Sequence, residues 1–221
     1  MQHLLLSTFE FVLHLDKHLN RLIESFGFGS YFILFLIIFC ETGLVVTPFL
    51  PGDSLLFTAG AIAATGSLNI FTLALMLSVA AILGDSVNYS LGMRLGKSVY
   101  QTEHLFGIPV KRKHMDEARA FYAKYGNKAI AFSRFLPILR TLVPFVAGVG
   151  AMPYRSFLVA NIIGGLVWVN LFTFGGYFFG NIPIVKQNFG YVVIGMIGVS
   201  LLPIVIEFTR LHFRKKTNTR V

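Results

Sequence analysis

The sequence contains little charge and a single cysteine. Only 13% of its 221 residues are charged and 55% are hydrophobic, whereas soluble domains carry roughly 25% charged residues. A soluble fold would have to hide long apolar runs inside one small core, so the composition favours a membrane protein. Cys40 has no second cysteine to pair with, which excludes an intrachain disulfide. The six histidines show no metal-ligand spacing, and we expect neither a metal nor a cofactor.

Acidic residues are also scarce. The chain has 10 Asp and Glu against 19 Lys and Arg, for a net charge of +9. Such an excess can indicate nucleic-acid binding, but these basic residues lie in loops between apolar segments, which indicates membrane orientation instead. No nucleic-acid partner is therefore expected. A cleavable signal peptide is not expected either, because the first ten residues lack Lys and Arg and Glu10 interrupts the apolar stretch.

Residues 1–28 have the period of an amphipathic helix. Their apolar residues recur every three or four positions, and the charged residues fall on other faces of the helix. The apolar positions are Leu5, Phe9, Val12, Leu15, Leu19, Leu22 and Phe26. We predict a helix that lies in the membrane interface rather than one that crosses the bilayer.

Six apolar segments follow, and together they predict an all-α integral membrane fold. A helix needs about 20 apolar residues to cross a bilayer, and the four predicted spans are residues 30–47, 68–93, 155–181 and 188–209. Residues 48–66 and 129–152 are broken by proline and glycine, which is tolerated at membrane depth only where the backbone is buried or lines a cavity. We predict that both form re-entrant hairpins. The breakers are Pro48, Pro51, Gly52, Pro137 and Pro144.

This pattern divides the chain into five parts. They are the interfacial helix 1–28, a first membrane repeat at 29–93, a basic cytoplasmic loop at 94–128, a second membrane repeat at 129–209 and a basic cytoplasmic tail at 210–221. With four spans, 16 of the 19 Lys and Arg fall on one face together with both termini. Positive charge marks the cytoplasmic face. Both termini are thus expected in the cytoplasm, with the hairpins entering from opposite faces.

A weak internal repeat agrees with opposed hairpins. The recurring elements are the Phe-Leu-Pro triplets at 49–51 and 135–137, the Ala-Gly pairs at 59–60 and 147–148, and the glycine pairs Gly92/Gly96 and Gly176/Gly180. We expect the glycine pairs to allow close packing inside the protein, the alternative being the face of a homodimer. Inverted repeats with interrupted segments are typical of transport sites.

Four ionisable residues lie in or beside the broken segments: Glu41, Asp53, Arg134 and Arg140. A charge at the centre of a membrane helix costs about 2.5–3.5 kcal/mol, so such residues must be paired or hydrated. The two arginines can bind phosphate through paired hydrogen bonds, with Thr141 as a further donor, while the acids exchange protons as gates. The alternative is a structural ion-pair cluster that only holds the two hairpins together.

Other polar residues are weaker candidates for the functional site. Asp85 and Asn88 lie one turn apart on the segment 68–93 and are secondary site candidates, although polar residues in spans more often hold helices together. Gly52-Asp53-Ser54 lacks the flanking pattern of a nucleophile elbow, and no histidine stands beside it. We therefore expect no enzymatic activity.

These motifs resemble the DedA family of bacterial inner-membrane proteins. The resemblance rests on the stretches 41–43, 48–54, 84–89, 134–141, 147–148 and 176–180. It implies two opposed re-entrant hairpins, as in eukaryotic VTT-domain lipid scramblases, and proton-motive-force-dependent movement of phospholipids or undecaprenyl phosphate across the inner membrane. It also implies that Glu41, Asp53, Arg134 and Arg140 are required for function.

The residues and the resemblance together predict a proton-coupled flippase or scramblase for lipid phosphates. Two alternatives remain open. A small-cation antiporter would use Glu41 and Asp53 to bind the cation, and a non-transporting scaffold would use the buried charges only for structure. The three hypotheses differ in what Arg134 and Arg140 do.

Overall fold

The computed structural model is helical in the part of the chain that it describes, apart from one pair of two-residue strands. It describes residues 15–44, 52–102, 104–105, 108–109, 112–126, 128–188, 190–192 and 195. Three of the expected features lie outside these residues. They are most of the span 188–209, the first half of the interfacial helix, and the breakers Pro48 and Pro51.

The described elements follow one another in a simple order. They are α2 (Leu15–Phe26), α3 (Gly29–Gly43), α4 (Gly52–Ala63), α5 (Ile70–Thr102), β1 (His104–Leu105), β2 (Ile108–Pro109), α6 (Arg112–Tyr125), α7 (Lys128–Ser133), α8 (Pro137–Val149), α9 (Tyr154–Phe179) and α10 (Pro183–Gln187). Strands β1 and β2 pair antiparallel. Helix α5 continues to Thr102, so it includes the first residues of the segment 94–128 that was expected to be a loop.

Two helices are long and apolar enough to cross a membrane, Ile70–Leu95 of α5 and Tyr154–Phe179 of α9. Large apolar side chains on both remain exposed, which water disfavours and lipid accepts. These exposed residues include Phe71, Leu75, Leu83, Val159, Ile163, Leu171 and Phe178. Length, composition and the exposed apolar faces together confirm an all-α membrane protein.

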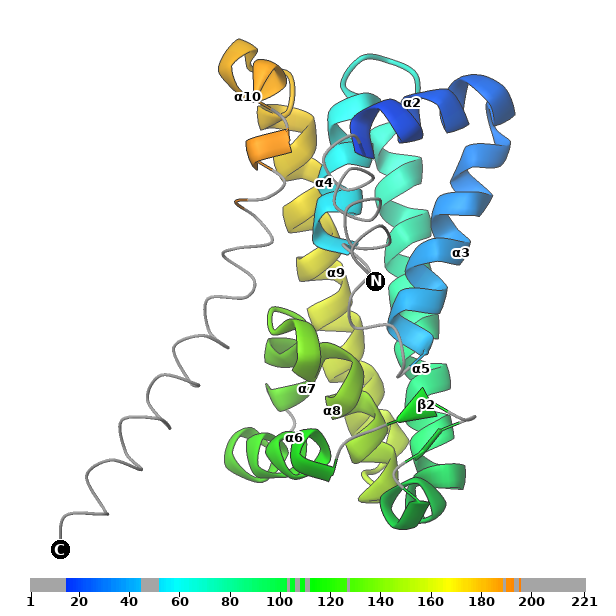
Figure 1. The fold of residues 1–221 in the computed structure, drawn as a ribbon, viewed down its shortest axis with the longest axis vertical. Helices are drawn as coiled ribbons and strands as arrows, with labels where there is room; N and C mark the ends of the chain where they lie inside the picture. Colours follow the sequence, from blue (N-terminus) through cyan, green and yellow to red (C-terminus); the bar gives the residue numbers. More distant parts are fainter. Residues whose placement is uncertain are drawn as a thin grey trace, which may run out of the picture.

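The short helices lie in two groups at opposite ends of the long pair. Helix α4 packs along α9, and helix α8 packs along α5. Figure 1 shows α4 in the upper part of the molecule, with α7 and α8 in the lower part. Helix α8 begins at Pro137, which suits the first helical position because its missing N–H would have no partner there.

Glycines set both of these close contacts. On α4 and α9, a Cβ at Gly60 or Gly176 would overlap the backbone carbonyl of Thr173 or Phe57. On α8 and α5, a Cβ at Gly148 or Gly92 would overlap the carbonyl of Tyr89 or Phe145. The two sets match the internal repeat of the sequence, and each short helix packs on the long helix of the other half. These glycines therefore serve internal packing.

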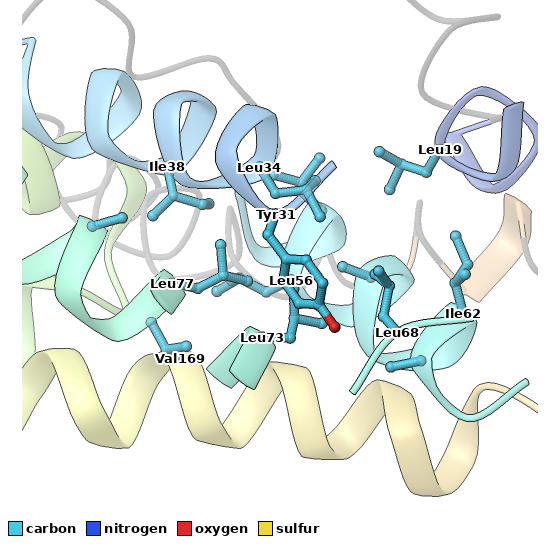
Figure 2. Packing of buried hydrophobic residues seen from close by; sticks show 14 of the residues in the cluster. Leu19, Tyr31, Leu34, Ile38, Leu56, Ile62, Leu68, Leu73, Leu77 and Val169 are labelled. Atoms are coloured by element: carbon cyan, nitrogen blue, oxygen red, sulfur yellow. The ribbon is translucent and has the colours of Figure 1, made fainter. Parts of the chain in front are cut away.

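One end of the molecule is closed by α2. Leu19 and Ile23 of α2 pack in the same buried cluster as Leu34, Ile62 and Leu68, and Figure 2 shows Leu19, Ile62 and Leu68 together at one end of this cluster. The apolar face of α2 thus lies on α3 and α4, as its helical period predicts, while its other side chains, such as Asn20 and Glu24, are exposed.

The placement of α2 corrects the expected path of residues 30–47. The N–H of Asn69 donates to the hydroxyl of Tyr31 at 2.6 Å, so α3 and α5 start at the same end of the molecule. Helix α3 has 15 residues, which span only about 22 Å, and it ends where Gly43 meets Gly84 of α5. The segment therefore does not carry the chain to the far end, where α6 lies (Figure 1).

We predict from this that α2 is exposed on the face opposite α6. Single cysteines at Asn20, Ser67 and Asn188, in a Cys40→Ser background, should react with an impermeant thiol reagent from the same side of oriented vesicles. A cysteine at Ala120 of α6 should react only from the other side. All four positions are exposed. Reaction of the Asn20 and Ala120 cysteines from one common side would restore the path expected from the sequence and contradict the structure.

Candidate functional site

Arg140 of α8 lies between two acids of the first half of the chain. Its Nη2 is 2.5 Å from Oε1 of Glu41, on α3, and its Nη1 is 3.0 Å from Oδ1 of Asp53, on α4. The side chains of Arg140 and Glu41 are 3% and 0% exposed, and that of Asp53 is 15% exposed. The structure therefore brings three of the four expected charges into one buried cluster, named the Arg140 cluster below.

Arg134 lies in the turn between α7 and α8 and belongs to a second cluster. Its Nη2 is 2.6 Å from Oδ2 of Asp85, on α5, and 2.5 Å from Oδ1 of Asn161, on α9. The amide of Asn161 in turn donates to the carbonyl of Ile82 at 3.0 Å. Arg134 and Asp85 are both 1% exposed at the side chain. We call this group the Arg134 cluster.

The second cluster changes the expected site. The sequence grouped Arg134 with Glu41 and Asp53 and treated Asp85 as secondary, but in the structure Asp85 is the ion-pair partner of Arg134. The site thus holds three carboxylates and two guanidinium groups. Asn161 also belongs to the site, and its only sign in the sequence is that it is a polar residue inside the apolar segment 155–181.

Trp168 of α9 joins the two clusters and was missed from the sequence. The guanidinium carbons of Arg134 and Arg140 lie 5.7 and 5.2 Å from the centre of its ring. Its Nε1 donates to Oδ1 of Asp53 at 2.8 Å, and the residue is fully buried. The only sign in the sequence was that Trp168 is the sole tryptophan of the chain. In an apolar segment such a residue is typical of ordinary packing.

Asn88 holds the backbone on both sides of the Arg140–Glu41 pair. Its Nδ2 donates to the carbonyl of Thr42 at 3.1 Å and to that of Thr141 at 2.7 Å. These two threonines directly follow Glu41 and Arg140 in the chain. Asn88 therefore fixes the distance between α3 and α8 at the ion pair. The expected role of the Thr141 hydroxyl as a phosphate donor stays a prediction.

Glycines make room for the charged groups. The N–H of Gly52, the first residue of α4, donates to Oε1 of Glu41 at 3.1 Å, and a Cβ at Gly52 would overlap this carboxylate. An acid at a helix N-terminus is also favoured by the helix dipole. On α9, a Cβ at Gly164 would lie 3.2 Å from Cδ of Arg134, and one at Gly165 would lie 3.4 Å from its Nη2. Larger residues would displace both charges.

The buried arginines keep hydrogen-bonding capacity. Within the described part of the chain, Nε and Nη1 of Arg134 and Nε of Arg140 are buried donors without a partner, and Oε2 of Glu41 and Oδ1 of Asp85 are buried acceptors without one. A buried unsatisfied polar group costs about 1–3 kcal/mol, and more when it is charged. Such a cost is typical of a site that receives a ligand. No group of three metal-ligating side chains is found among the described residues.

Long apolar helices that enclose paired charges define a polytopic helical membrane protein with an ionic site in its interior. Residues 50–178 match the model of the VTT domain. The chain is 51% identical over 207 residues to Protein DedA of Escherichia coli, covering 91% of this chain and 92% of that one. It is 39% identical to the uncharacterized membrane protein Rv0364 of Mycobacterium tuberculosis, covering 84% and 82% of the two chains, and 36% identical to the inner membrane protein YghB of E. coli, covering 80% and 78%.

The chain therefore belongs to the DedA family of VTT-domain membrane proteins. The family predicted from the motifs is thus confirmed. No solved structure matches the chain.

We predict that Asn88→Leu destabilises the protein strongly. The substitution leaves the carbonyls of Thr42 and Thr141 without this donor, at about 1–3 kcal/mol each, so the melting temperature in detergent should fall. The matched control is Asn170→Leu, because Asn170 donates within its own helix, to the carbonyl of Leu166. Equal melting temperatures for the two variants would show that Asn88 does not hold the helices together.

Double substitutions test the assignment of ion-pair partners. Removing one member of a buried pair typically costs about 3–5 kcal/mol, because the other charge is left uncompensated. Asp85→Asn combined with Arg134→Gln should therefore recover much of the melting temperature that either single change loses. Asp53→Asn combined with Arg134→Gln serves as the mismatched control and should lose nearly the sum of both effects. Equal recovery in the two doubles would reject separate clusters.

Proposed function

We propose that the protein moves lipid phosphates between the leaflets of the bacterial inner membrane, as a proton-coupled flippase or scramblase. The observation that carries this proposal is the pair of buried arginines whose N–H groups are in part without a partner among the described residues. Arg134 and Arg140 lie on the second broken segment, inside a protein whose outer face is apolar. A phosphate headgroup needs such donors to leave water, while its acyl chains can stay in the lipid.

Arginine suits this task because its charge persists in a medium of low dielectric. The guanidinium group is planar and offers several N–H donors in fixed directions, which match the oxygens of a phosphate. Among the described residues, Arg140 uses both Nη groups on carboxylates and Arg134 uses Nη2 alone, while Nε of each arginine has no partner. A phosphate that replaces one carboxylate can then be held by two N–H groups of the same arginine.

The charge balance supports proton coupling. Three carboxylates face two guanidinium groups, so the site carries a net charge of −1 when every group is ionised. Entry of an anionic phosphate would add to this excess in a medium that screens charge poorly. Proton uptake by Glu41, Asp53 or Asp85 removes the repulsion and frees an arginine. Release of the phosphate then allows the acid to return its proton.

We assign the helix pairs α3–α4 and α7–α8 to two re-entrant hairpins that enter from opposite faces. Each pair returns to the end from which it started, and α5 and α9 supply the crossings. The α6 end carries most of the basic residues near the crossings, which assigns it to the cytoplasm. These residues are Arg94, Lys97, Arg112, Lys113, Arg119, Lys124, Lys128 and Arg155. Relatives such as YghB are named inner membrane proteins, which agrees with this location.

Cation exchange is the second candidate. The unpaired carboxylate oxygens of Glu41 and Asp85 favour it, since such oxygens can accept a small cation or its proton. In that mechanism the arginines only balance charge. Neither mechanism makes or breaks a covalent bond in the substrate, so the proposal includes no enzymatic activity.

Arg140→Lys separates the two candidates. The substitution keeps the positive charge and loses the planar group, so lipid exchange in proteoliposomes should fall about tenfold or more if phosphate is bound there. Arg155→Lys, on the cytoplasmic end of α9, is the control and should exchange labelled lipid at the wild-type rate. Cation-driven proton flux, measured in the same vesicles, should be absent. Full lipid exchange by Arg140→Lys would contradict phosphate binding, and proton flux driven by a cation gradient would favour the antiporter.

A further inference from the structure

Trp168 contacts both clusters. It presents its ring to Arg134 and Arg140, at 5.7 and 5.2 Å from the ring centre, and its N–H to Asp53, at 2.8 Å. It is also the largest fully buried side chain among the described residues. Its position on α9 therefore links the carboxylate of one half of the protein with both guanidinium groups of the other.

The ring stabilises the arginines in a way that a carboxylate cannot. A carboxylate holds a guanidinium group by occupying its N–H donors, whereas an aromatic ring attracts the cation through its face and leaves those donors vacant. This agrees with the unpaired Nε atoms of both arginines and the unpaired Nη1 of Arg134. Desolvated cation–π contacts contribute most strongly, and tryptophan gives the strongest of them.

The indole N–H adds a second constraint. It donates to Oδ1 of Asp53, the same oxygen that Arg140 contacts at 3.0 Å. If Arg140 binds another anion instead, Asp53 therefore still accepts a hydrogen bond from the uncharged indole N–H. A phenyl ring at this position would keep the cation contact but would lose this donor.

We propose that Trp168 is a positioning residue for phosphate binding. Its ring holds the two charged guanidinium groups next to each other and leaves their N–H donors available to the phosphate. The inference rests on the proposed function, since phosphate lipids are the anions it concerns. Through its N–H, Trp168 also holds Asp53 in place during exchange. Its two roles use different atoms, so they can be separated by substitution.

The test compares Trp168→Leu with Trp168→Phe in the full-length protein. Dihexanoyl phosphatidic acid is titrated calorimetrically in detergent, and dihexanoylglycerol serves as the probe without phosphate. Trp168→Leu should bind the phosphatidic acid about tenfold more weakly than wild type, because the cation–π contacts are lost. Trp168→Phe should stay within about threefold of wild type and yet exchange lipid more slowly, because Asp53 loses its donor. A merely structural role would not separate binding from rate in this way.

Phe157→Leu is the matched control. Phe157 is a fully buried aromatic residue of the same helix, and its ring packs on Tyr89 and Tyr154. This variant should bind the phosphatidic acid as wild type does, even if its melting temperature falls. The inference is overturned if Trp168→Leu binds as tightly as wild type, or if Phe157→Leu loses as much affinity.

Two further measurements keep the inference distinct from the proposed function. Because Trp168 is the sole tryptophan, its fluorescence in the wild-type protein should change on addition of dihexanoyl phosphatidic acid and not of dihexanoylglycerol. The change should disappear in Arg140→Gln. An emission that does not respond to the phosphatidic acid overturns the inference whatever lipid exchange shows. Wild-type protein that binds the probe but does not exchange lipid rejects the proposed function and leaves the positioning role supported.

Discussion

The pairing of buried charge between the two halves of the chain is the constraint on which the other features depend. Each half presents charge that it does not neutralise by itself: the acids come from α3, α4 and α5, and the arginines come from the second half. Burying either set alone would cost several kcal/mol for each ion. The halves are therefore stable only when they interlock, and the close helix contacts are what bring the charges within reach.

The two halves of the chain share the same close glycine contacts but carry charges of opposite sign in the site. Glycine contacts recur on α4 with α9 and on α8 with α5, so each broken segment is held by the long helix of the other repeat. The acids come from the first half of the chain and the arginines from the second half. In the proposed transport function, the two broken segments form two faces of the site, and movement of one helix pair against the other opens either of them.

Polar residues other than the charged ones complete the site. Asn88 fixes the backbone at the Arg140–Glu41 pair, Asn161 holds the far side of Arg134, and Trp168 contacts both arginines. Each contributes hydrogen bonds or ring contacts that orient a charge without adding one. The charge of the site is therefore set by the five ionisable groups.

The sequence by itself determined the membrane class, the family, the extent of α9 and the four charged residues of the broken segments. These follow from composition, from apolar segment length and from prolines, which act locally along the chain. Only the tertiary structure decided that Arg134 pairs with Asp85, that Trp168 contacts both arginines and that α3 ends beside Gly84. The physical reason is that a partner is chosen by distance in three dimensions. Helical period reveals which face of a helix is apolar, but not which helix covers that face.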